Sequence, residues 1–408
     1  MTEPPLKTLI RSGLLLAGLF FLPFGTAGGK PQMNKSGLMQ NLALKCAELY
    51  RKETIVQAIL GKMTPEEKLY QLIFTDFGGW RWNNLAEFLS NNTLGGLILM
   101  GHNIEGSSYD SLKEKIAKLS SLSTKIPVMI CVDQEGGLVQ RLKPVIDSFP
   151  LPSKILKDKG IDGVAAMAQY FAEKMSDLGI HVDFAPVLDL CPNKNSVVFK
   201  RILSESAETN ALLGNLFIDK FAEYGMAAVP KHYPGYGTVS ADPHYFVCKD
   251  TKSELSEIAW PFFQLPGCRM MMTAHVVFTK TDYLPATLSP AALGLLREYF
   301  DGVIITDDLR MQSISALYEY KKGALMSLQA GCDAILLITP GLEDWRKNAS
   351  NMVAYLSAAL TNGQLTTAQI DEKAARILRL KLELLSGSEW GILGADEVAE
   401  MVKLFPVK

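Results

Sequence analysis

Four short segments of the sequence combine carboxylates, imidazoles and an amine in a way that could support catalysis. Each follows or ends a run of apolar residues: Asp133 to Glu135, Lys231-His232, His275, and Asp307-Asp308. Carboxylates and imidazoles transfer protons, a carboxylate or a lysine forms covalent intermediates, and several carboxylates together hold Mg²⁺. These residue types indicate an active site if the fold brings the segments together.

Each segment also has an ordinary explanation when it is taken alone. An Asp after a strand is often a helix N-cap, and a single buried His is usually a hydrogen-bonded core residue. Four such segments are harder to explain in this way, because burying several unpaired polar groups is costly unless a ligand or a network uses them.

The elements that precede these segments decide where they lie. Apolar runs recur eight times, with longer mixed segments between them: Leu69–Phe74, Gly95–Met100, Pro127–Asp133, His181–Val187, Ala227–His232, Met270–His275, Gly302–Asp307 and Ala334–Ile338. Continuous apolar runs favour parallel strands buried on both faces, and amphipathic segments such as Ala211–Tyr224 favour connecting helices. We therefore predict an α/β fold, a (β/α)₈ TIM-type barrel with its reacting groups at the carboxyl ends of the strands.

An open, doubly wound sheet is the alternative fold for the same pattern. That fold often binds nucleotides, but no glycine-rich fingerprint follows the first run and no Walker sequence is present. Nucleotide binding therefore has no support.

The N-terminal segment has the layout of a secretory signal peptide. Lys7 and Arg11 precede an apolar stretch, Leu14–Pro23, which small residues up to Ala27 follow. An uncleaved membrane anchor is the alternative, but the apolar stretch is shorter than the ~20 residues that a spanning helix needs. No Cys follows it, so it does not indicate a lipoprotein. We expect cleavage near Ala27 and an exported protein, periplasmic or extracellular.

We divide the remaining chain into an N-terminal helical extension (28–62), a single catalytic barrel (63–385) and a C-terminal tail (386–408). Helical spacing of Leu, Ile and Ala runs from about Ser36 to Leu60. Thr64 followed by Pro65 and Glu67 predicts a capped helix start.

The composition excludes some partners. The 408 residues carry a formal net charge of -2, with acids and bases interspersed, so nucleic acid is not an expected partner. The six cysteines show no CxxC or Cys/His ligand spacing, so we expect no structural zinc, and their pairing is open. Cys131 and Cys332 lie beside or within apolar runs and are expected to be buried. We expect a monomer without stable membrane insertion after signal cleavage.

Beyond these patterns, six segments between about Pro65 and Leu380 resemble bacterial β-N-acetylglucosaminidases of glycoside hydrolase family 3. They are GGLILMGHNI (95–104), VDQEGGLVQRL (132–142), DFAPVLDL (183–190), KHYPGYGTVSADPH (231–244), TAHVVF (273–278) followed by PATLSP (285–290), and GVIITDDL (302–309). The resemblance implies a retaining glycosidase that removes terminal non-reducing N-acetylglucosamine from peptidoglycan fragments through a covalent glycosyl-enzyme intermediate, without a cofactor or a metal.

The resemblance also implies roles for individual residues. Asp307 matches the nucleophile, while Asp308 fits a bracing or capping role. His244 matches an acid/base on a loop, held by Asp242, which would fix the tautomer and raise the basicity of the ring.

The sugar contacts of the family map onto Asp133, Arg141, Arg201, Lys231 and His232. Arg201 matches only loosely, and Lys200 beside it could be mistaken for it. Lys231 could instead be a structural partner of a neighbouring acid.

Three positions depart from the family pattern. Tyr236 replaces a His, Pro243 replaces a Ser between the two members of the pair, and Leu138 stands where an Arg is common. Pro243 removes an amide donor and fixes one backbone angle, so the geometry of the pair could differ.

Other functions remain open from the residues alone. The site could serve a β-glycosidase of other specificity or a glycoside phosphorylase. Lys231 could form a Schiff base, or Asp133, Glu135, Asp307 and Asp308 could hold Mg²⁺. A non-catalytic muropeptide-binding protein is an alternative of another class.

Overall fold

The computed structural model describes residues 35–339, 344–385 and 390–393. The chain divides into two units, Ala58–Leu393 and a second unit made of Met1–Gln57 with Gly394–Lys408. The predicted signal peptide and most of the predicted C-terminal tail lie outside the described residues. The helix predicted from about Ser36 to Leu60 is present as α2 (Lys35–Lys62). Within the described ranges, no helix has both the length and the apolar character needed to cross a membrane.

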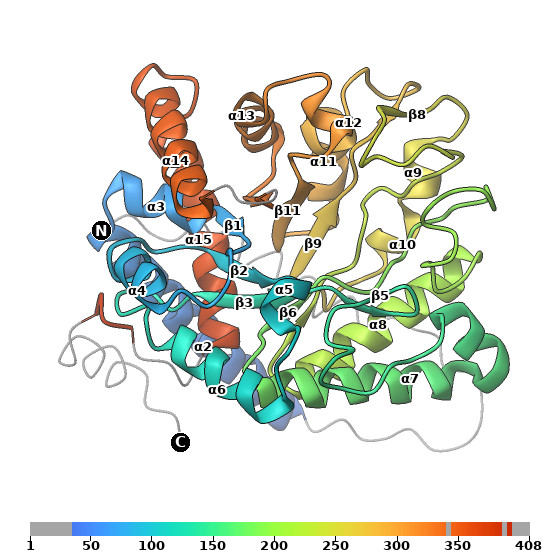
Figure 1. Cartoon of the computed structure of the whole chain (residues 1–408), viewed down its shortest axis with the longest axis horizontal. Coiled ribbons are helices and arrows are strands. Elements are labelled where there is room, and N and C mark those ends of the chain that lie inside the picture. Colours follow the sequence, from blue (N-terminus) through green and yellow to red (C-terminus); the bar gives the residue numbers. More distant parts are fainter. Residues whose placement is uncertain (1–34, 340–343, 386–389, 394–408) are drawn as a thin grey trace. The chain divides into compact units, whose positions relative to one another are not determined.

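The larger unit is built around a parallel sheet. Its strands are β1 (Ile73–Thr75), β2 (Gly96–Leu99), β3 (Met129–Val132), β6 (Val182–Asp183), β7 (Ala227–Ala228), β9 (Met270–Thr273), β11 (Val303–Asp308) and β12 (Ala334–Leu337). They form one 8-stranded sheet in the order β7-β6-β3-β2-β1-β12-β11-β9 (Figure 1). The first strand therefore pairs with the last, as a barrel requires.

The residues after β7 bring the two edges of this sheet together. Tyr233 forms a parallel bridge with Thr273 of β9, and the amide of Met272 donates to the carbonyl of Pro230 at 3.1 Å. The predicted (β/α)₈ barrel is confirmed, and the open, doubly wound sheet is wrong.

All eight apolar runs overlap a strand of the sheet, but the first run is partly misassigned. Leu69 and Gln71 belong to the end of α3 (Pro65–Gln71), and β1 starts only at Ile73. The predicted start of this helix is confirmed, since Thr64 Oγ1 accepts from the Glu67 amide and Glu67 Oε2 accepts from the Thr64 amide.

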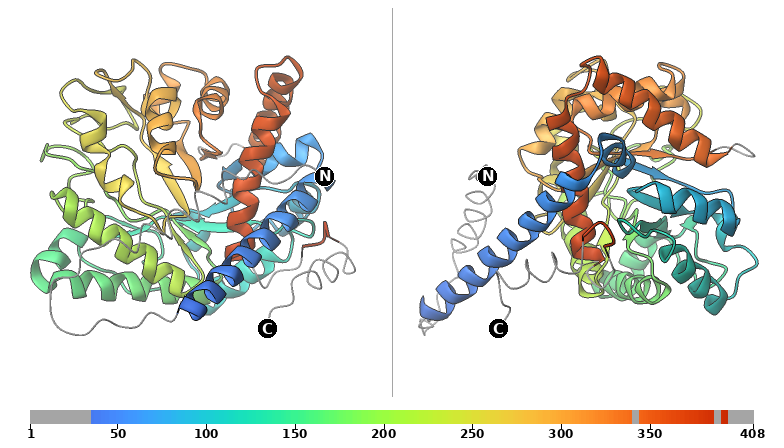
Figure 2. Two further views of the ribbon diagram at one scale, coloured as in Figure 1. Left: turned by 180° about the vertical axis from the view of Figure 1, so that it is seen from behind. Right: turned by 90° about the vertical axis from the view of Figure 1, so that its left-hand side faces the viewer.

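Helices connect and cover the strands. They are α4 (Trp82–Asn91), α5 (Gly101–Ile104), α6 (Tyr109–Ser120), α7 (Pro152–Leu178), α8 (Ala207–Glu223), α9 (Leu255–Ile258), α10 (Trp260–Phe263), α11 (Pro290–Arg297), α12 (Gln312–Ser315), α13 (Tyr320–Ala330), α14 (Trp345–Thr361) and α15 (Thr367–Leu384). Figures 1 and 2 show the long helices α7 and α8 side by side outside the sheet. Helix α3 packs against α14 and α15, which ties the start of the barrel to its end.

The core lies between the sheet and this helical layer. Every residue of β1, β2, β3, β9 and β12 is buried, as expected for strands covered on both faces. Cys131 and Cys332 are buried as predicted, and none of the six cysteines forms a disulfide.

Two small sheets shape the carboxyl edge of the barrel. One is the hairpin of β4 (Gln134–Gly136) and β5 (Val139–Gln140); the other pairs β8 (Cys248–Asp250) with β10 (Val276–Phe278). Gly137 has a φ of 60° at the hairpin turn, and a Cβ there would lie 2.7 Å from Leu151 Cδ2. The turn therefore needs glycine, and it fixes the residues just after β3.

Candidate active site

A buried ion-pair cluster lies at the carboxyl ends of β3 and β7. Lys231 Nζ is 2.7 Å from Asp133 Oδ1 and 2.7 Å from Glu135 Oε1. Arg201 forms a bidentate pair with Glu135, with Nε 2.9 Å from Oε2 and Nη2 2.7 Å from Oε1. Two cations thus face two carboxylates, so the buried charges balance.

This balance keeps the members of the cluster ionised. Burial acts to lower the pKa of Lys231, but the carboxylates of Asp133 and Glu135 outweigh it, and the pKa is raised. Burial acts to raise the pKa of Glu135, but Lys231 and Arg201 lower it to about 2. A Schiff base needs a neutral amine, so the geometry does not support that role for Lys231.

His232 connects the cluster to Asp307. Its Nδ1 lies 2.8 Å from Asp189 Oδ2, so the ring is oriented by a buried carboxylate. Its Nε2 lies 3.4 Å from Arg201 Nη2 and 4.0 Å from Asp307 Oδ2. The imidazole therefore lies between the ion-pair cluster and the predicted nucleophile.

Asp307 and Asp308 adjoin in sequence but have different surroundings. Asp307 Oδ1 accepts from the amide of Asp308 at 2.8 Å, while Oδ2 faces His232. Burial acts to raise the pKa of Asp307, but His232, His275, the Asp308 amide and Lys231 outweigh it, and the pKa is lowered. The Asp307 carboxylate is thus ionised, and one of its oxygens makes no hydrogen bond within the described structure.

Asp308 instead braces the backbone. Its Oδ1 accepts from the amides of Arg310 and Ile338, both at 3.1 Å, which joins the loops after β11 and β12. Burial raises its pKa to about 7 despite these two hydrogen bonds.

His275 contacts the backbone at the end of β11. Its Nε2 lies 3.0 Å from the carbonyl of Asp308, and its Nδ1 lies 2.8 Å from Thr287 Oγ1. A carbonyl only accepts, so Nε2 donates to it, while Thr287 Oγ1, which donates to the Ala274 carbonyl at 2.8 Å, lies within hydrogen-bonding distance of Nδ1. His275 therefore positions the end of β11 without facing solvent.

Asp242 and His244 form a pair on the loop between β7 and β8. Asp242 Oδ1 lies 2.8 Å from His244 Nδ1 and also accepts from the His244 amide at 2.9 Å. The amide that joins the pair belongs to His244, so the missing N–H of Pro243 is not needed. Pro243 is buried, and its carbonyl accepts from the Ser313 amide at 3.0 Å, which anchors the loop on α12.

The loop between β7 and β8 is also held by Asp250 at the end of β8. Asp250 accepts from the amide of Thr238 at 2.7 Å and from those of Lys252 and Ser253 at 2.8 Å. Tyr236, where the family has a His, is buried and packs edge to face on His232, with ring centroids 5.5 Å apart.

The structure brings most of the predicted residues together. Asp133, Lys231, Arg201, His232 and Asp307 form one continuous set. Lys200 is exposed, whereas Arg201 contacts Glu135, so Arg201 is the residue of this pair that lies in the cluster.

Arg141 is linked to this set only through its backbone, whose amide donates to the Asp133 carbonyl at 3.3 Å. The buried Arg141 Nε has no hydrogen-bond partner among the described residues.

Sequence reasoning considered Glu135 only as a possible Mg²⁺ ligand, not as a partner of Lys231 and Arg201, and it missed Asp189 as a member of the site. Both lie in the segments that carried the resemblance, VDQEGG and DFAPVLDL, and both follow predicted strands. Asp183 in the second segment was also missed. It accepts from the Gln134 amide at 2.8 Å and supports the hairpin beneath the cluster, and burial raises its pKa well above the ordinary value.

The positions of the four carboxylates do not support a Mg²⁺ site. Glu135 is occupied by Lys231 and Arg201, and Asp308 by backbone amides. In the ranges that the structure describes, no three His, Cys, Asp or Glu side chains form a group that could hold a metal ion.

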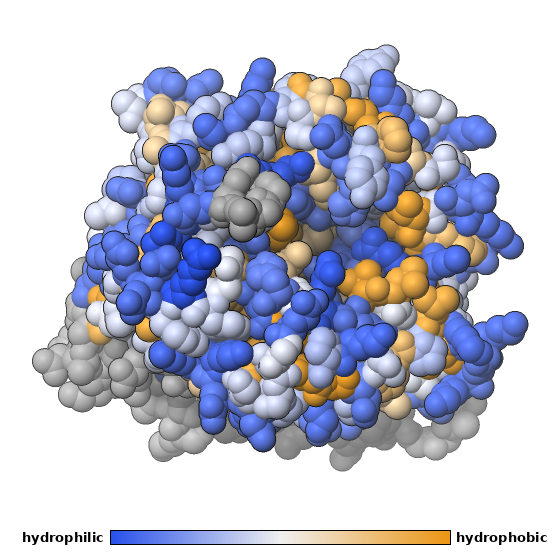
Figure 3. All heavy atoms as spheres, in the orientation of Figure 1, coloured by the Kyte–Doolittle hydropathy of each residue, from blue (hydrophilic) through white to orange (hydrophobic). Residues whose placement is uncertain are grey.

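The surface around the site is mixed in character. In Figure 3, hydrophilic residues surround a hollow near the centre of the view, and hydrophobic residues gather to its right.

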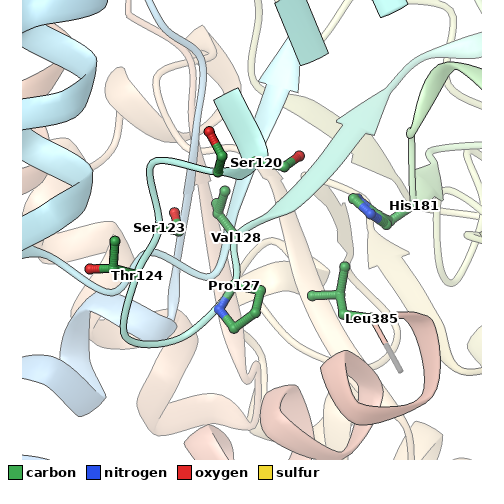
Figure 4. Close-up of a pocket in the computed structure, with 8 residues that line it drawn as sticks. Ser120, Ser123, Thr124, Pro127, Val128, His181 and Leu385 are labelled. Carbon is green, nitrogen blue, oxygen red and sulfur yellow. The ribbon is translucent and has the colours of Figure 1, made fainter. Parts of the chain in front are cut away.

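A separate pocket of about 380 Å³ lies at the amino ends of the strands (Figure 4). Ser120, Pro127, His181 and Leu385 are among the residues that line it. Because Pro127 precedes β3 and His181 precedes β6, this pocket is at the opposite end of the barrel from the carboxylates.

Comparisons with known proteins agree with this geometry. Residues 64–380 match the model of the glycosyl hydrolase family 3 N terminal domain. A beta-hexosaminidase of Methylococcus capsulatus is 32% identical over 320 residues, which cover 74% of this chain and 91% of that protein. A beta-hexosaminidase of Tolumonas auensis is 35% identical over 263 residues, covering 61% of this chain and 77% of that protein.

Solved structures give the same result. A glycoside hydrolase family 3 beta-N-acetylglucosaminidase from Paenibacillus sp. str. FPU-7 superposes with a TM-score of 0.73 at 29% identity, covering 84% of this chain and 68% of that one. A family member from Mycobacterium smegmatis superposes with a TM-score of 0.70 at 26% identity, covering 79% and 98%. This chain is a glycoside hydrolase and belongs to glycosyl hydrolase family 3.

Proposed function

We propose that this chain is a retaining β-N-acetylglucosaminidase that removes terminal non-reducing N-acetylglucosamine from muropeptides. The proposal rests on two groups of the candidate active site, the Asp307 carboxylate and the Asp242–His244 pair. Asp307 presents an ionised oxygen without a hydrogen bond, and a hydrogen-bonded Asp242–His244 pair lies on a loop that the Ser313 amide anchors shortly after β11. A retaining glycosidase needs one nucleophilic carboxylate and one separate acid/base.

In the first step, Asp307 Oδ2 attacks the anomeric carbon while the glycosidic bond breaks. His244 protonates the departing oxygen from Nε2, since Nδ1 is held by Asp242. In the second step, the now neutral ring takes a proton from water, and the hydroxyl displaces Asp307 from the sugar. Asp242 keeps the proton on Nδ1 throughout and stabilises the imidazolium.

The ion-pair cluster supports recognition of the sugar hydroxyls. Lys231 holds Asp133 through Oδ1, which leaves the other Asp133 oxygen to accept from a hydroxyl. Arg201 and His232 supply donors and acceptors beside it, and Arg141, the other predicted sugar contact, is joined to Asp133 through its backbone amide. Preorganised contacts of this kind orient the sugar ring without a further cost in side-chain ordering.

The acetamido preference rests on the relatives, which carry the names beta-hexosaminidase and beta-N-acetylglucosaminidase. The cell-wall substrate also rests on export, which the signal-like segment at residues 1–27 indicates. We expect the mature chain to begin near Gly28 and to occur outside the cytoplasm. N-terminal sequencing of the protein recovered from cell fractions tests this, and a full-length chain soluble in the cytoplasm would contradict it.

A chromogenic N-acetyl-β-glucosaminide, compared with the plain β-glucoside, tests the activity and the acetamido preference together. We expect turnover of the first to exceed that of the second clearly. A mechanism-based 2-deoxy-2-fluoro glycoside should then label Asp307, as located by mass spectrometry. An adduct on Asp308 would overturn the assignment of the nucleophile.

A non-catalytic muropeptide-binding protein has less support. That alternative assumed that Pro243 disrupts the pair, but the His244 amide and ring both reach Asp242. Binding of N-acetylglucosamine without any turnover would nevertheless favour it over a glycosidase.

A further inference from the structure

The residues after His244 are two exposed aromatic side chains. Tyr245 is 72% exposed and Phe246 is 60% exposed, although most aromatic residues of the described barrel are buried or half-buried. The ring of Tyr245 lies beside that of His244, with centroids 6.3 Å apart. Large apolar side chains that are left in solvent next to a reaction site commonly contact a ligand.

The exposure of these rings does not come from a loose loop. The amides of Tyr245 and Phe246 both donate to the Asp242 carbonyl, at 3.0 and 2.9 Å, which closes a tight turn. The carbonyl of Pro243 is held by Ser313, and β8 starts at Cys248 and pairs with β10. The backbone therefore presents both rings from a fixed turn.

The chemistry of the acid/base limits what can lie there. His244 Nε2 must come within about 2.6–3.2 Å of the glycosidic oxygen to protonate it. That oxygen joins the cleaved sugar to the leaving group, so the leaving group begins beside His244 and hence beside Tyr245. The C–H faces of a pyranose ring are apolar and pack well on an aromatic ring.

We propose that Tyr245 and Phe246 form the aglycone subsite, where they stack on the sugar ring that is released. This inference rests on the proposed glycosidase function. It makes the turn that carries the acid/base also the element that selects the leaving group. Substrates with a second sugar ring gain this contact, and substrates without one do not.

The test compares two substrates that form the same glycosyl-enzyme. One is the β-1,4-linked disaccharide of N-acetylglucosamine; the other is N-acetyl-β-glucosaminyl fluoride, whose leaving group has no ring. For Tyr245→Ala and Phe246→Ala, we expect the ratio of kcat/KM for the disaccharide to that for the fluoride to fall roughly 3–10-fold. Tyr245→Phe keeps the ring and should restore the wild-type ratio.

Tyr299→Ala is the matched control. Tyr299 is 59% exposed but precedes β11, so it lies at the amino end of the barrel, and its removal should leave the ratio unchanged. An unchanged ratio in Tyr245→Ala and Phe246→Ala, with a wild type that cleaves both substrates, would overturn the subsite. A wild type that cleaves neither substrate would instead count against the proposed function.

Self-association through these rings is the competing outcome. Light scattering on the wild type and on both alanine variants measures it. Monomers throughout are expected, and a wild-type dimer that the substitutions dissociate would assign the rings to an interface between copies of the chain.

Discussion

Each end of the barrel buries a lysine, but the pKa of the lysine is shifted in opposite directions at the two ends. Lys231, at the carboxyl ends of the strands, is 3% exposed and contacts the carboxylates of Asp133 and Glu135. Lys381 of α15, at the amino ends, is fully buried, and among the described residues it donates a hydrogen bond only to the carbonyl of Leu94, at 2.7 Å. Burial lowers the pKa of Lys381 well below its ordinary value, whereas the pKa of Lys231 is raised.

Lys373, like Lys381, is a buried lysine that donates to a backbone carbonyl and has a lowered pKa. It donates to the carbonyl of Cys332 at 2.7 Å, and burial lowers its pKa although Asp333 lies near. The amino end therefore buries two amines whose pKa is lowered by burial and which donate to backbone carbonyls. The carboxyl end keeps its charges and balances them, which is what a site for polar hydroxyls and a carboxylate nucleophile requires.

The largest expected effect that separates the two ends is on turnover. Asp307→Ala should lower kcat/KM by several orders of magnitude while the fold persists, because in the proposed mechanism this carboxylate forms the covalent intermediate. Ser120→Ala, in the pocket at the amino ends, should leave kcat/KM unchanged. Steady-state kinetics and circular dichroism on both variants measure this. A comparable loss in Ser120→Ala would break the assignment of chemistry to the carboxyl end.

The next effect depends on the leaving group. His244→Ala should impair glycosides with poor leaving groups by about 10²–10⁴-fold, and aryl glycosides with good ones far less, because only the former need protonation. Asp242→Ala should show the same pattern more weakly, since the ring remains but loses its orientation. A leaving-group series on both variants, with azide or phosphate as added acceptor, provides the measurement. Equal losses on all leaving groups would remove His244 from the acid/base role.

The two lysines should differ in their effect on stability. Lys231→Met leaves buried carboxylates with too little positive charge and should lower the free energy of unfolding by about 3–5 kcal/mol. Lys381→Met loses one hydrogen bond but also removes a buried amine, so the change should not exceed about 1 kcal/mol. Urea denaturation at neutral pH compares them. Equal losses would show that the carboxylates are not the reason for the difference.

The smallest effects are in the pH dependence of stability. The folded-state pKa of Glu135, about 2, lies below its ordinary value of 4.5, so its contribution is present above pH 4.5 and is lost as the pH falls towards 2. The pKa of Lys381 is also lowered, but for a base the unfolded chain then binds more protons. Stability should therefore rise as the pH increases towards the ordinary lysine value of 10.5.

Two variants separate the contributions of Glu135 and Lys381 to the pH dependence of the unfolding free energy. Glu135→Gln should flatten the acid side of the stability profile, and Lys381→Met the alkaline side. Unfolding free energies measured across the pH range provide the comparison. An alkaline slope that persists in Lys381→Met would mean that another group causes it.

The pattern of apolar runs was enough to predict the barrel, because strands buried on both faces need continuous apolar residues. The same pattern could not predict where α3 ends and β1 begins. The run that begins at Leu69 is shared between the end of α3 and β1, and a short buried run fits either element. Strand-end residues such as Asp133, Lys231 and Asp307 were predictable for the same reason, since the fold sends every carboxyl end to one face.

Only the tertiary structure decided which partners these residues have. Asp189 orients His232 across 43 positions of sequence, and Arg201 rather than Lys200 reaches Glu135. Such pairs form because loops from different strands meet at one edge, and no local pattern encodes their approach. The contrast between Lys231 and Lys381 has the same origin. A lysine in a sequence carries no sign of whether carboxylates or a single carbonyl will surround it, and those neighbours set the direction of its pKa.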